Sequence, residues 1–550
     1  MENNTDTDLM FDYIIIGTGP SGAIMAKTLS DNQNVSVLVL EAGENNTREE
    51  PIRILSSETL RWYPNYFWQG RTVQQQNVNR RLYNWTTGRT LGGGSSVNGG
   101  QYVRPTEDFF RAWERQSGPL WSPQNALRFY TQMEAYQGCV YGPFVHGCNG
   151  RVNIRVSPDN VPSLNKKFAD AIAQATGYPI IQDYNDPETP LGPFTQWALY
   201  QNPEGERVSA ATAYLSQDII TPEGTGVNGR RLTVLMKTTV LRILINEDNV
   251  AVGVEFLREG WQQNAFASRM VILSAGINTS QLLLLSGIGP ADRLNRLGIP
   301  VRVDNPNVGL NLINHTISAA TFTVNPQDLA ELRDGPYSLY NGGAFLPLPY
   351  SESPSRRGIQ MIGQINGDLL TVLMLNLSPV SRGSITLQNN DPLKITLADY
   401  NFLSDRQDLL HIINSFRSYI LPIAEVLSDI DPEYRLISPS YEVINDDALL
   451  EDYIRSNLEI AYHEQGFNRM APLPEEGVVN QWAEVYGVGR LLLADSSIIP
   501  IPLDCNTSSA SYFIGYALAN LLLQEEEQPA SYFYPAYPIR YNSNSDIELI

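Results

Sequence analysis

The chain has 550 residues, which is too long for one compact hydrophobic core, so we expect two or more domains. Its formal net charge of −21 argues against nucleic acid as a partner, because such binding relies on Lys and Arg that neutralise phosphates. No segment reaches the ~18 consecutive apolar residues that a membrane span needs, and the polar start MENNTDTDLM lacks the basic flank and apolar stretch of a signal peptide. The composition therefore predicts a soluble protein.

The first predicted unit is a strand, a glycine turn and a helix. The apolar run Tyr13–Ile16 precedes Gly17-x-Gly19-x-x-Gly22, and VSVLVLEAG predicts a second buried strand that ends at Glu41. This is the context that a dinucleotide-binding unit requires. The glycines let the backbone approach a pyrophosphate, the helix N-terminus offers free N–H groups, and the acid can accept from ribose hydroxyls. An acid here would repel a 2′-phosphate, which disfavours NADP and leaves NAD and FAD.

A second glycine-rich segment, LGGGSSVNGGQYVRP at residues 91–105, distinguishes between these two cofactors. A nicotinamide enzyme has no need for such a segment. The wide tricyclic ring of a flavin requires backbone that can approach it closely, which glycine permits. The sequence therefore favours FAD.

Later segments predict further strands and one long buried helix. RLTVLMKTTVLRILIN, AVGVEFL and RMVILSAGINTS have the apolar patterns of strands, and LLLADSS predicts a strand that ends at Asp495. SSASYFIGYALANLLL is apolar almost all round, which indicates a buried helix, and Asn506-Thr507-Ser508 offers a strong N-cap.

Four motifs, taken together and in this order, resemble the glucose–methanol–choline (GMC) family of flavin oxidoreductases. They are GTGPSG, TLGGGSSVNGGQYVRP, GINTSQLLLLSGIGP, and YHEQGFNRM followed by LLLADSSIIPIPLDCNTSSASYFIGYALAN. The resemblance extends over about residues 11–523. It implies an α/β fold in which a Rossmann-like FAD-binding domain is interleaved with an α+β substrate domain, an antiparallel sheet flanked by helices.

The resemblance also implies discontinuous domains. The FAD-binding domain is expected at 1–155, 205–305 and 465–524, the substrate-binding domain at 156–204 and 306–464, and a C-terminal extension at 525–550.

The resemblance implies that the flavin ring lies against Gly92–Gly100. Some relatives carry a histidine, bonded covalently to the ring, at the position of Val97, and valine has no nucleophile, so non-covalent FAD is expected. Only the backbone of Val240 is implicated, and a plain core valine is the alternative there. For Asp495 the alternative is an acid that only caps a turn. The implied cofactor-binding residues are Gly17, Gly19, Ser21, Gly22, Glu41, Ala42, Arg89, Gly93, Ser95, Asn98, Gly99, Val240, Ala275, Gly276, Asp495 and Thr507. No metal is expected.

The resemblance assigns a base among only four histidines. His463, in AYHEQGF, aligns with the active-site histidine of the family, and an imidazole with a pKa near 6.5 can accept a proton at neutral pH. His411 is expected to be a structural residue on a helix and His146 a turn residue. His315 aligns with a family position but is interpreted as structural rather than catalytic.

The second catalytic position departs from much of the family. Many relatives carry a histidine where this chain has Asn506, and others have asparagine. Asparagine cannot act as a base, but its amide can donate to the substrate oxygen, much as an oxyanion-hole donor does. The alternative is that Asn506 only caps the helix; its carbonyl and amide ends could also serve both roles.

The activity that the resemblance implies is FAD-dependent oxidation of a primary alcohol to an aldehyde, with O2 or another acceptor reoxidising the flavin. Tyr462 precedes the base and favours aromatic or allylic alcohols. The segment 337–358, rich in aromatic residues, Pro and Gly, is expected to form a loop over the substrate cavity or on the surface. The alternatives are a hydroxynitrile-lyase-like activity without net redox change and a mainly structural virion-surface protein. The second follows from an overall similarity to the GMC-type proteins of giant DNA viruses.

Two features stay open at this point. Cys139 and Cys148 flank a short loop and could pair in an oxidising compartment or remain free thiols. The oligomeric state is also open, with a homodimer as one alternative.

Overall fold

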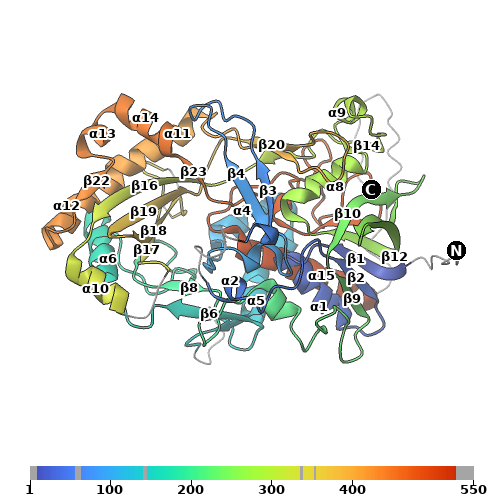
Figure 1. The fold of residues 1–550 in the computed structure, drawn as a ribbon. Coiled ribbons are helices and arrows are strands. Elements are labelled where there is room, and N and C mark those ends of the chain that lie inside the picture. The colour runs from blue at the N-terminus through green and yellow to red at the C-terminus, as the bar shows by residue number, and fades with distance from the viewer. Residues whose placement is uncertain (1–8, 56–62, 140–144, 335–338, 352–354, 528–550) are drawn as a thin grey trace.

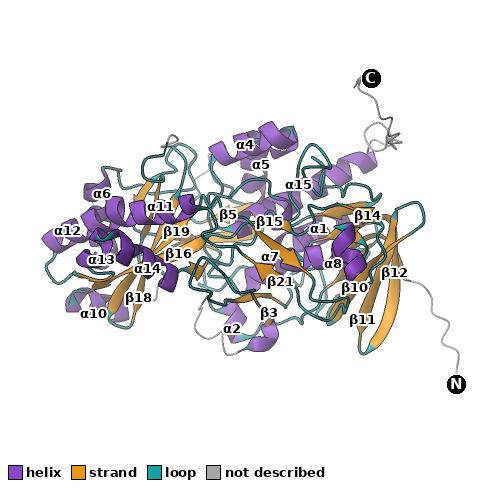
Figure 2. Ribbon diagram, turned by 90° about the horizontal axis from the view of Figure 1, so that it is seen from above, coloured by secondary structure: helices purple, strands orange, loops and turns teal. Residues whose placement is uncertain are grey.

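The computed structural model describes residues 9–55, 63–139, 145–334, 339–351 and 355–527. Two large sheets stand at opposite ends of an elongated molecule, and strands β3 and β4 rise between them (Figure 1). Seen from above, β10–β12 form one end and β16–β19 the other (Figure 2).

The first sheet is a parallel sheet extended by an antiparallel ribbon, in the order β10-β11-β12-β1-β2-β9, with β24 also paired to β12. Its central strands are runs of Ile, Val and Leu buried on both faces, as expected for parallel strands covered by helices. The strands are β1 (Leu9–Ile16), β2 (Val37–Leu40), β9 (Leu232–Leu235), β10 (Thr238–Ile245), β11 (Ala251–Arg258), β12 (Trp261–Leu273) and β24 (Leu491–Leu493).

Two helices meet beside the carboxyl end of β1. Helix α1 (Pro20–Ser30) begins directly after β1, and the long C-terminal helix α15 (Thr507–Glu527) packs against it. A Cβ atom on Gly515 of α15 would lie 2.5 Å from the Cα atom of Ser21, so only glycine permits this crossing. Shorter helices near this domain are α7 (Ala210–Tyr214), α8 (Thr279–Leu285) and α9 (Ala291–Arg296).

The second sheet is antiparallel, in the order β22-β16-β19-β18-β17-β7, with β23 also paired to β16. Buried and partly exposed residues alternate along β16, so one face of this strand packs on the core. The strands are β7 (Gly192–Phe194), β16 (Thr316–Thr323), β17 (Gly343–Leu346), β18 (Ile359–Asn366), β19 (Leu369–Asn376), β22 (Leu436–Ser438) and β23 (Glu459–Ile460). The helices are α6 (Ser163–Thr176), α10 (Pro326–Asp334), α11 (Arg406–Ser415), α12 (Leu421–Ile430), α13 (Tyr441–Asn445) and α14 (Asp447–Asn457).

Smaller elements fill the centre. The helices are α2 (Glu50–Arg53), α4 (Glu107–Ser117) and α5 (Pro123–Met133). The strands are β3 (Phe67–Arg71), β4 (Asn84–Gly88), β5 (Glu134–Tyr136), β6 (Val152–Ser157), β8 (Trp197–Leu199), β13 (Ile288–Gly289), β14 (Val303–Asp304), β15 (Leu310–Leu312), β20 (Gly383–Thr386) and β21 (Leu397–Asp399).

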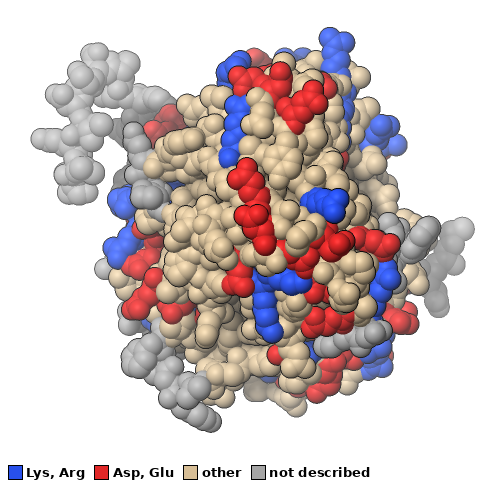
Figure 3. Space-filling model, turned by 90° about the vertical axis from the view of Figure 1, so that its left-hand side faces the viewer, with Lys and Arg blue, Asp and Glu red and all other residues tan. Residues whose placement is uncertain are grey.

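The end of the molecule that carries the second sheet faces the viewer in Figure 3. Acidic and basic side chains are interspersed on this face, so the side chains described there form no continuous basic surface for nucleic acid. Along the described part of the chain, no helix is both long enough and apolar enough to cross a membrane.

The predicted α/β fold with a second, antiparallel sheet is confirmed. The interpretation of 337–358 as one loop is wrong, because Gly343–Leu346 forms the buried strand β17; residues 337–338 and 352–354 lie outside the described residues. Helix α15 continues to Glu527, and residues 528–550 of the expected C-terminal extension lie outside the described residues. Cys139 and Cys148, left open above, form a disulfide. The domain boundaries stay predictions.

The crossing at Gly515 yields a test of how α15 is held. Alanine favours a helix over glycine by about 1 kcal/mol, so any loss of stability in Gly515→Ala reports the clash with Ser21. We expect the free energy of unfolding in a denaturant titration to fall by about 1–3 kcal/mol. The exposed Gln524→Ala on the same helix should leave it unchanged. A Gly515→Ala protein as stable as the native one would contradict the tight crossing.

Candidate active site

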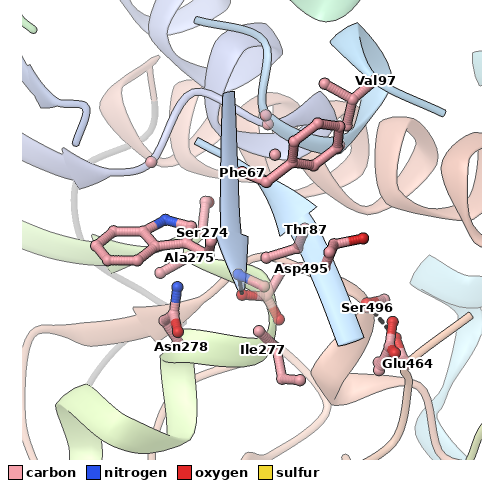
Figure 4. Close-up of a pocket in the computed structure, with 18 of the residues that line it drawn as sticks. Phe67, Thr87, Val97, Ser274, Ala275, Ile277, Asn278, Glu464, Asp495 and Ser496 are labelled. Carbon is pink, nitrogen blue, oxygen red and sulfur yellow. Dashed lines mark hydrogen bonds between the residues drawn. The ribbon is translucent and has the colours of Figure 1, made fainter. Parts of the chain in front are cut away.

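A cavity of about 1210 Å³ lies at the carboxyl ends of β1 and β12 and extends toward β23. It exceeds the roughly 300–1,000 Å³ of a pocket for one small molecule, as a site for a dinucleotide and a substrate must. Figure 4 shows part of its wall, where residues from β3, β4, the turn after β12 and the segment after β24 face one another. Every predicted cofactor-binding and catalytic residue lines this cavity except Gly22 and Arg89.

The turn after β1 forms a cradle for a phosphate group. Gly17 has φ +97°, and a Cβ atom there would lie 2.5 Å from the carbonyl oxygen of Ser274. A Cβ atom on Gly22 would strike the Gly17 carbonyl, so Gly22 packs the helix on the turn instead of facing the cavity. A Cβ atom on Gly19 would meet nothing within 4 Å. The N-terminus of α1 is therefore open to an anionic ligand.

Glu41 is 5% exposed and braces this turn. Its Oε2 atom accepts from the backbone N–H of Thr18 at 3.0 Å and from the Thr18 hydroxyl at 2.5 Å, and its Oε1 accepts from the Gly43 N–H at 2.8 Å. Burial raises the pKa of the carboxyl, although these hydrogen bonds and the nearby Arg89 charge oppose that shift. A carboxylate has about four acceptor positions, so one is left for a ribose hydroxyl.

Arg89 is the other predicted residue outside the cavity wall. Its guanidinium lies 4.7 Å from the centre of the Trp68 ring, and Trp68 does line the cavity. Arg89 therefore acts through its charge near Glu41 and through the ring that it covers.

The glycine-rich loop is held from outside the segment. The Ser95 hydroxyl donates to the Gly92 carbonyl at 2.6 Å and accepts from the Ala210 N–H at 2.9 Å. The Arg207 guanidinium donates to the Asn98 carbonyl at 2.6 Å. The sequence interpretation missed Arg207, because its basic charge near this loop arises from a segment more than 100 residues away. Val97 faces the cavity close to Phe67 (Figure 4).

Asp495 ties three segments together at the end of β24. Its carboxylate accepts from the Gly276 N–H at 3.0 Å and the Thr279 hydroxyl at 2.6 Å, and from the Ser497 N–H at 2.9 Å. Burial raises its pKa. Asp495 lines the cavity and also caps the turn, and its role toward the cofactor stays a prediction.

His463 and His315 are brought together by sheet pairing. Strand β23 runs antiparallel to β16, and Ile460 pairs with Thr316. His315, just before β16, therefore lies close to His463, which follows β23. The two Nδ1 atoms lie 2.9 Å apart, and His315 Nε2 lies 2.9 Å from the Leu503 carbonyl oxygen. Sequence reasoning treated His315 as structural because nothing local to it signals this partner.

The Leu503 carbonyl fixes both tautomers, because a carbonyl oxygen can only accept. His315 must therefore carry its proton on Nε2, which leaves its Nδ1 as an acceptor. His463 must then donate from Nδ1, and its Nε2 retains a lone pair. That lone pair faces the Asn506 amide nitrogen at 3.1 Å. The arrangement presents a base to the cavity.

Both imidazoles are neutral at pH 7. Burial lowers the pKa of His315 to about 4 and lowers the pKa of His463 well below 6.5, to which the adjacent His315 ring contributes. The ordinary value near 6.5 assumed from the sequence is therefore too high for His463. The reactive, unprotonated form is fully present across the neutral range.

Asn506 stands at the entrance to α15 with both ends of its amide engaged. Its Nδ2 donates to His463 Nε2 and to Gln101 Oε1, the latter at 3.2 Å, and its Oδ1 accepts from Gln360 Nε2 at 3.2 Å. Neither glutamine was singled out from the sequence. Thr507, Ser508 and Ser511 continue the cavity wall along α15.

The remaining histidines lie elsewhere. His146 bonds to the carboxylates of Glu134 and Asp183, so it is more than the turn residue expected. His411 lies on α11, away from the cavity, as predicted. Within the described ranges, no three His, Cys, Asp or Glu side chains gather where they could hold a metal ion.

Comparison with known proteins decides the family. The family model of GMC oxidoreductases matches in two parts, residues 11–317 and residues 379–515. The chain belongs to the GMC oxidoreductase family. The predicted membership is thus confirmed, and this GMC oxidoreductase is a flavoprotein for which FAD binding is supported.

Relatives of this GMC oxidoreductase include enzymes named for alcohols. An alcohol dehydrogenase (acceptor) from Pseudomonas putida is 30% identical over 94% of this chain and 96% of its own length. An oxygen-dependent choline dehydrogenase from Rhizobium etli is 29% identical over 94% of this chain and 96% of its own. A formate oxidase structure from Aspergillus oryzae, from a study of FAD modification, superposes with a TM-score of 0.83 at 25% identity, covering 95% of this chain and 99% of that one.

The contacts of Glu41 predict its role in holding FAD. Glu41→Gln keeps one acceptor oxygen but sets an NH2 donor against at least one of the three N–H or O–H groups that the carboxylate accepts from, so we expect FAD affinity to fall about 10- to 100-fold. Fluorescence of FAD released on dilution measures this. The matched control is Glu44→Gln: the exposed carboxylate of Glu44 pairs with Lys237 at 2.9 Å, and this variant should retain native affinity. Equal FAD release from both variants would rule out a specific role for Glu41.

Proposed function

We propose that this GMC oxidoreductase oxidises a primary alcohol to an aldehyde, with His463 as the base and Asn506 as the donor to the substrate oxygen. The observation that carries the proposal is the lone pair of His463 Nε2, held in a buried site 3.1 Å from the Asn506 Nδ2 atom. This distance leaves no room for an oxygen atom between the two, so a substrate hydroxyl would replace their direct hydrogen bond, donating to His463 Nε2 and accepting from Asn506 Nδ2.

The residues act in a simple order. His463 Nε2 takes the hydroxyl proton and becomes an imidazolium, while Nδ1 keeps its proton against His315. The Asn506 amide stabilises the negative charge that grows on the oxygen. FAD, when bound, supplies the acceptor for the hydride that leaves the carbinol carbon, and O2 or another acceptor then takes up the electrons.

The cavity suits FAD in several respects. The open positions at Gly19 and Gly94, the remaining acceptor site on Glu41, and the N-terminus of α15 support the binding of a ring and a pyrophosphate there. Among the predicted cofactor residues, Gly17, Gly19, Ser21, Glu41, Ala42, Gly93, Ser95, Asn98, Gly99, Val240, Ala275, Gly276, Asp495 and Thr507 would contact it directly.

Aromatic and allylic alcohols are the favoured substrate class. Phe67, Trp68 and Tyr462 line the cavity, and flat apolar substrates pack well on such rings. The described residues of 337–358 do not line it, so the support now comes from these three side chains. A non-redox lyase activity has no separate observation in its favour. A location on a virion surface and a homodimeric state stay sequence-based predictions.

The side chain of Val97 predicts that FAD is bound without a covalent link. Because valine offers no attachment atom, we expect acid precipitation of the purified protein to release all the flavin into the supernatant. Absorbance of supernatant and pellet measures the split. Yellow colour retained in a washed pellet would show a covalent bond and refute this prediction.

The roles proposed for His463 and Asn506 predict how their removal changes the rate at which an alcohol reduces the flavin in the absence of O2. General-base removal costs about 10²–10⁴-fold and loss of one oxyanion-type donor about 10²–10³-fold, so His463→Ala should slow reduction at least as much as Asn506→Ala. The pKa of His463 is lowered, so the base is unprotonated throughout the neutral range. Native reduction should therefore be flat there and fall only in acid.

Stopped-flow absorbance gives these rates, and His411→Ala on α11 is the control that should reduce at the native rate. The acid limb should disappear in His463→Ala and persist in Asn506→Ala, because asparagine does not titrate. A flavin-loaded His463→Ala protein that reduces at the native rate would remove His463 from the mechanism.

A further inference from the structure

Arg207 is a buried cation that bonds only to neutral groups among the described residues. It lies between β8 and α7 and is 4% exposed. Its guanidinium donates to the Ile52 carbonyl at 2.9 Å, to the Ser95 carbonyl at 3.4 Å, and to the carbonyl and side-chain oxygens of Asn98 at 2.6 and 3.1 Å. Burial lowers the pKa of this guanidinium to about 10, so it stays charged at pH 7.

Two other buried arginines show what is different about Arg207. Arg104 forms an ion pair with the buried carboxylate of Glu134. The charges of Asp504 and other nearby groups favour the charged form of Arg357. Among the described neighbours of Arg207, only the Tyr340 hydroxyl acts in this way, and a tyrosine is uncharged at pH 7. An uncompensated buried charge is costly to keep, so a negative charge is expected near it when the site is filled.

The bonds of Arg207 place its charge directly behind the loop that lines the cavity. Ser95, Asn98 and Gly99 line the cavity, whereas Arg207 does not. The peptide that joins Asn98 to Gly99 is trans, so its N–H points away from the guanidinium that holds its C=O. This N–H finds no acceptor among the described residues. It is therefore a donor, polarised by Arg207, that is left for a ligand.

Reduction of FAD would create a negative charge at this place. A hydride brings two electrons and one proton to the flavin ring, which is neutral when oxidised. The reduced ring is therefore an anion unless a second proton follows. A cation in the protein interior interacts strongly with such an anion, because the surroundings screen little. The charge of Arg207 thus favours the reduced ring over the oxidised ring.

We propose that Arg207 is a positioning residue for the glycine-rich loop and that its charge raises the reduction potential of bound FAD. This inference rests on the expected position of the flavin ring against Gly92–Gly100. It gives a redox role to a side chain that touches neither the substrate nor the wall of the cavity.

The test measures the midpoint potential of the FAD-loaded protein by anaerobic titration with dithionite and a reference dye, so no alcohol is needed. Arg207→Met removes the charge at a similar side-chain length. We expect the ratio of reduced to oxidised flavin at a fixed potential to fall about tenfold or more, which for a two-electron couple is about 30 mV or more. Arg207→Gln serves as the neutral variant if Arg207→Met does not retain FAD.

Arg207→Lys separates the charge from the shape of the side chain. Lysine keeps the positive charge but loses the planar fork of donors. This variant should therefore keep a potential close to the native one even though FAD is bound less tightly.

Arg53→Met is the matched control. The Arg53 side chain is half-exposed and pairs with Glu206, and the Arg53 carbonyl accepts from the Arg207 N–H at 2.7 Å. The variant removes a paired cation from the segment beside Arg207, so the midpoint potential should stay at the native value.

The native protein also provides a test that needs no variant, because its bound FAD should have a higher midpoint potential than free FAD. A value at or below that of free FAD would overturn the inference. An unchanged potential in the neutral variant would do the same. An equal fall in the neutral variant and in Arg207→Lys would show that only the shape of the loop matters. If the potentials behave as expected but no alcohol reduces the flavin, the proposed function fails and the role of Arg207 stands.

Discussion

The carbonyl oxygen of Leu503 sets the direction of the hydrogen bonds that join His315, His463 and Asn506. It fixes the proton of His315, which fixes that of His463, which in turn orients Asn506. None of these three side chains carries a charge at neutral pH, so they are buried without the large desolvation cost of an ion. A charge would arise only when a substrate proton arrives, and the network is already arranged to receive it.

A protein of net charge −21 is equipped to hold an anionic dinucleotide without a cluster of Lys and Arg at the cradle described here. The positive potential comes from backbone N–H groups at the starts of α1 and α15, and the close crossing at Gly515 packs α15 against the first turn of α1. The two nearby carboxylates, Glu41 and Asp495, are largely occupied by donors from the chain itself. Peptide dipoles, rather than side-chain charges, therefore provide the attraction.

The sequence predicts those parts of the site that are local along the chain. The turn at Gly17, the acid at Glu41 and the loop before Val97 are visible because glycines and strands stand in fixed order. The contacts of His315 with His463 depend on the pairing of β23 with β16, which no local pattern encodes. The lowered pKa of His463 follows from burial that only the folded chain creates. Strand β17 was missed because Gly343 looks like a loop residue, although it sits where a Cβ atom would press on the Trp197 ring.

The placement of β24 has a consequence for how the protein is made. Its residues Leu491–Leu493 pair with β12, more than two hundred residues earlier, and α15 follows still later. The ribosome must therefore release almost the whole chain before the wall of the FAD cavity can close. Until then one edge of β12 lacks its parallel neighbour, which is the kind of strand edge that invites aggregation. We therefore expect FAD capture only after synthesis, once the residues that follow β24 and those of α15 have joined the cavity wall.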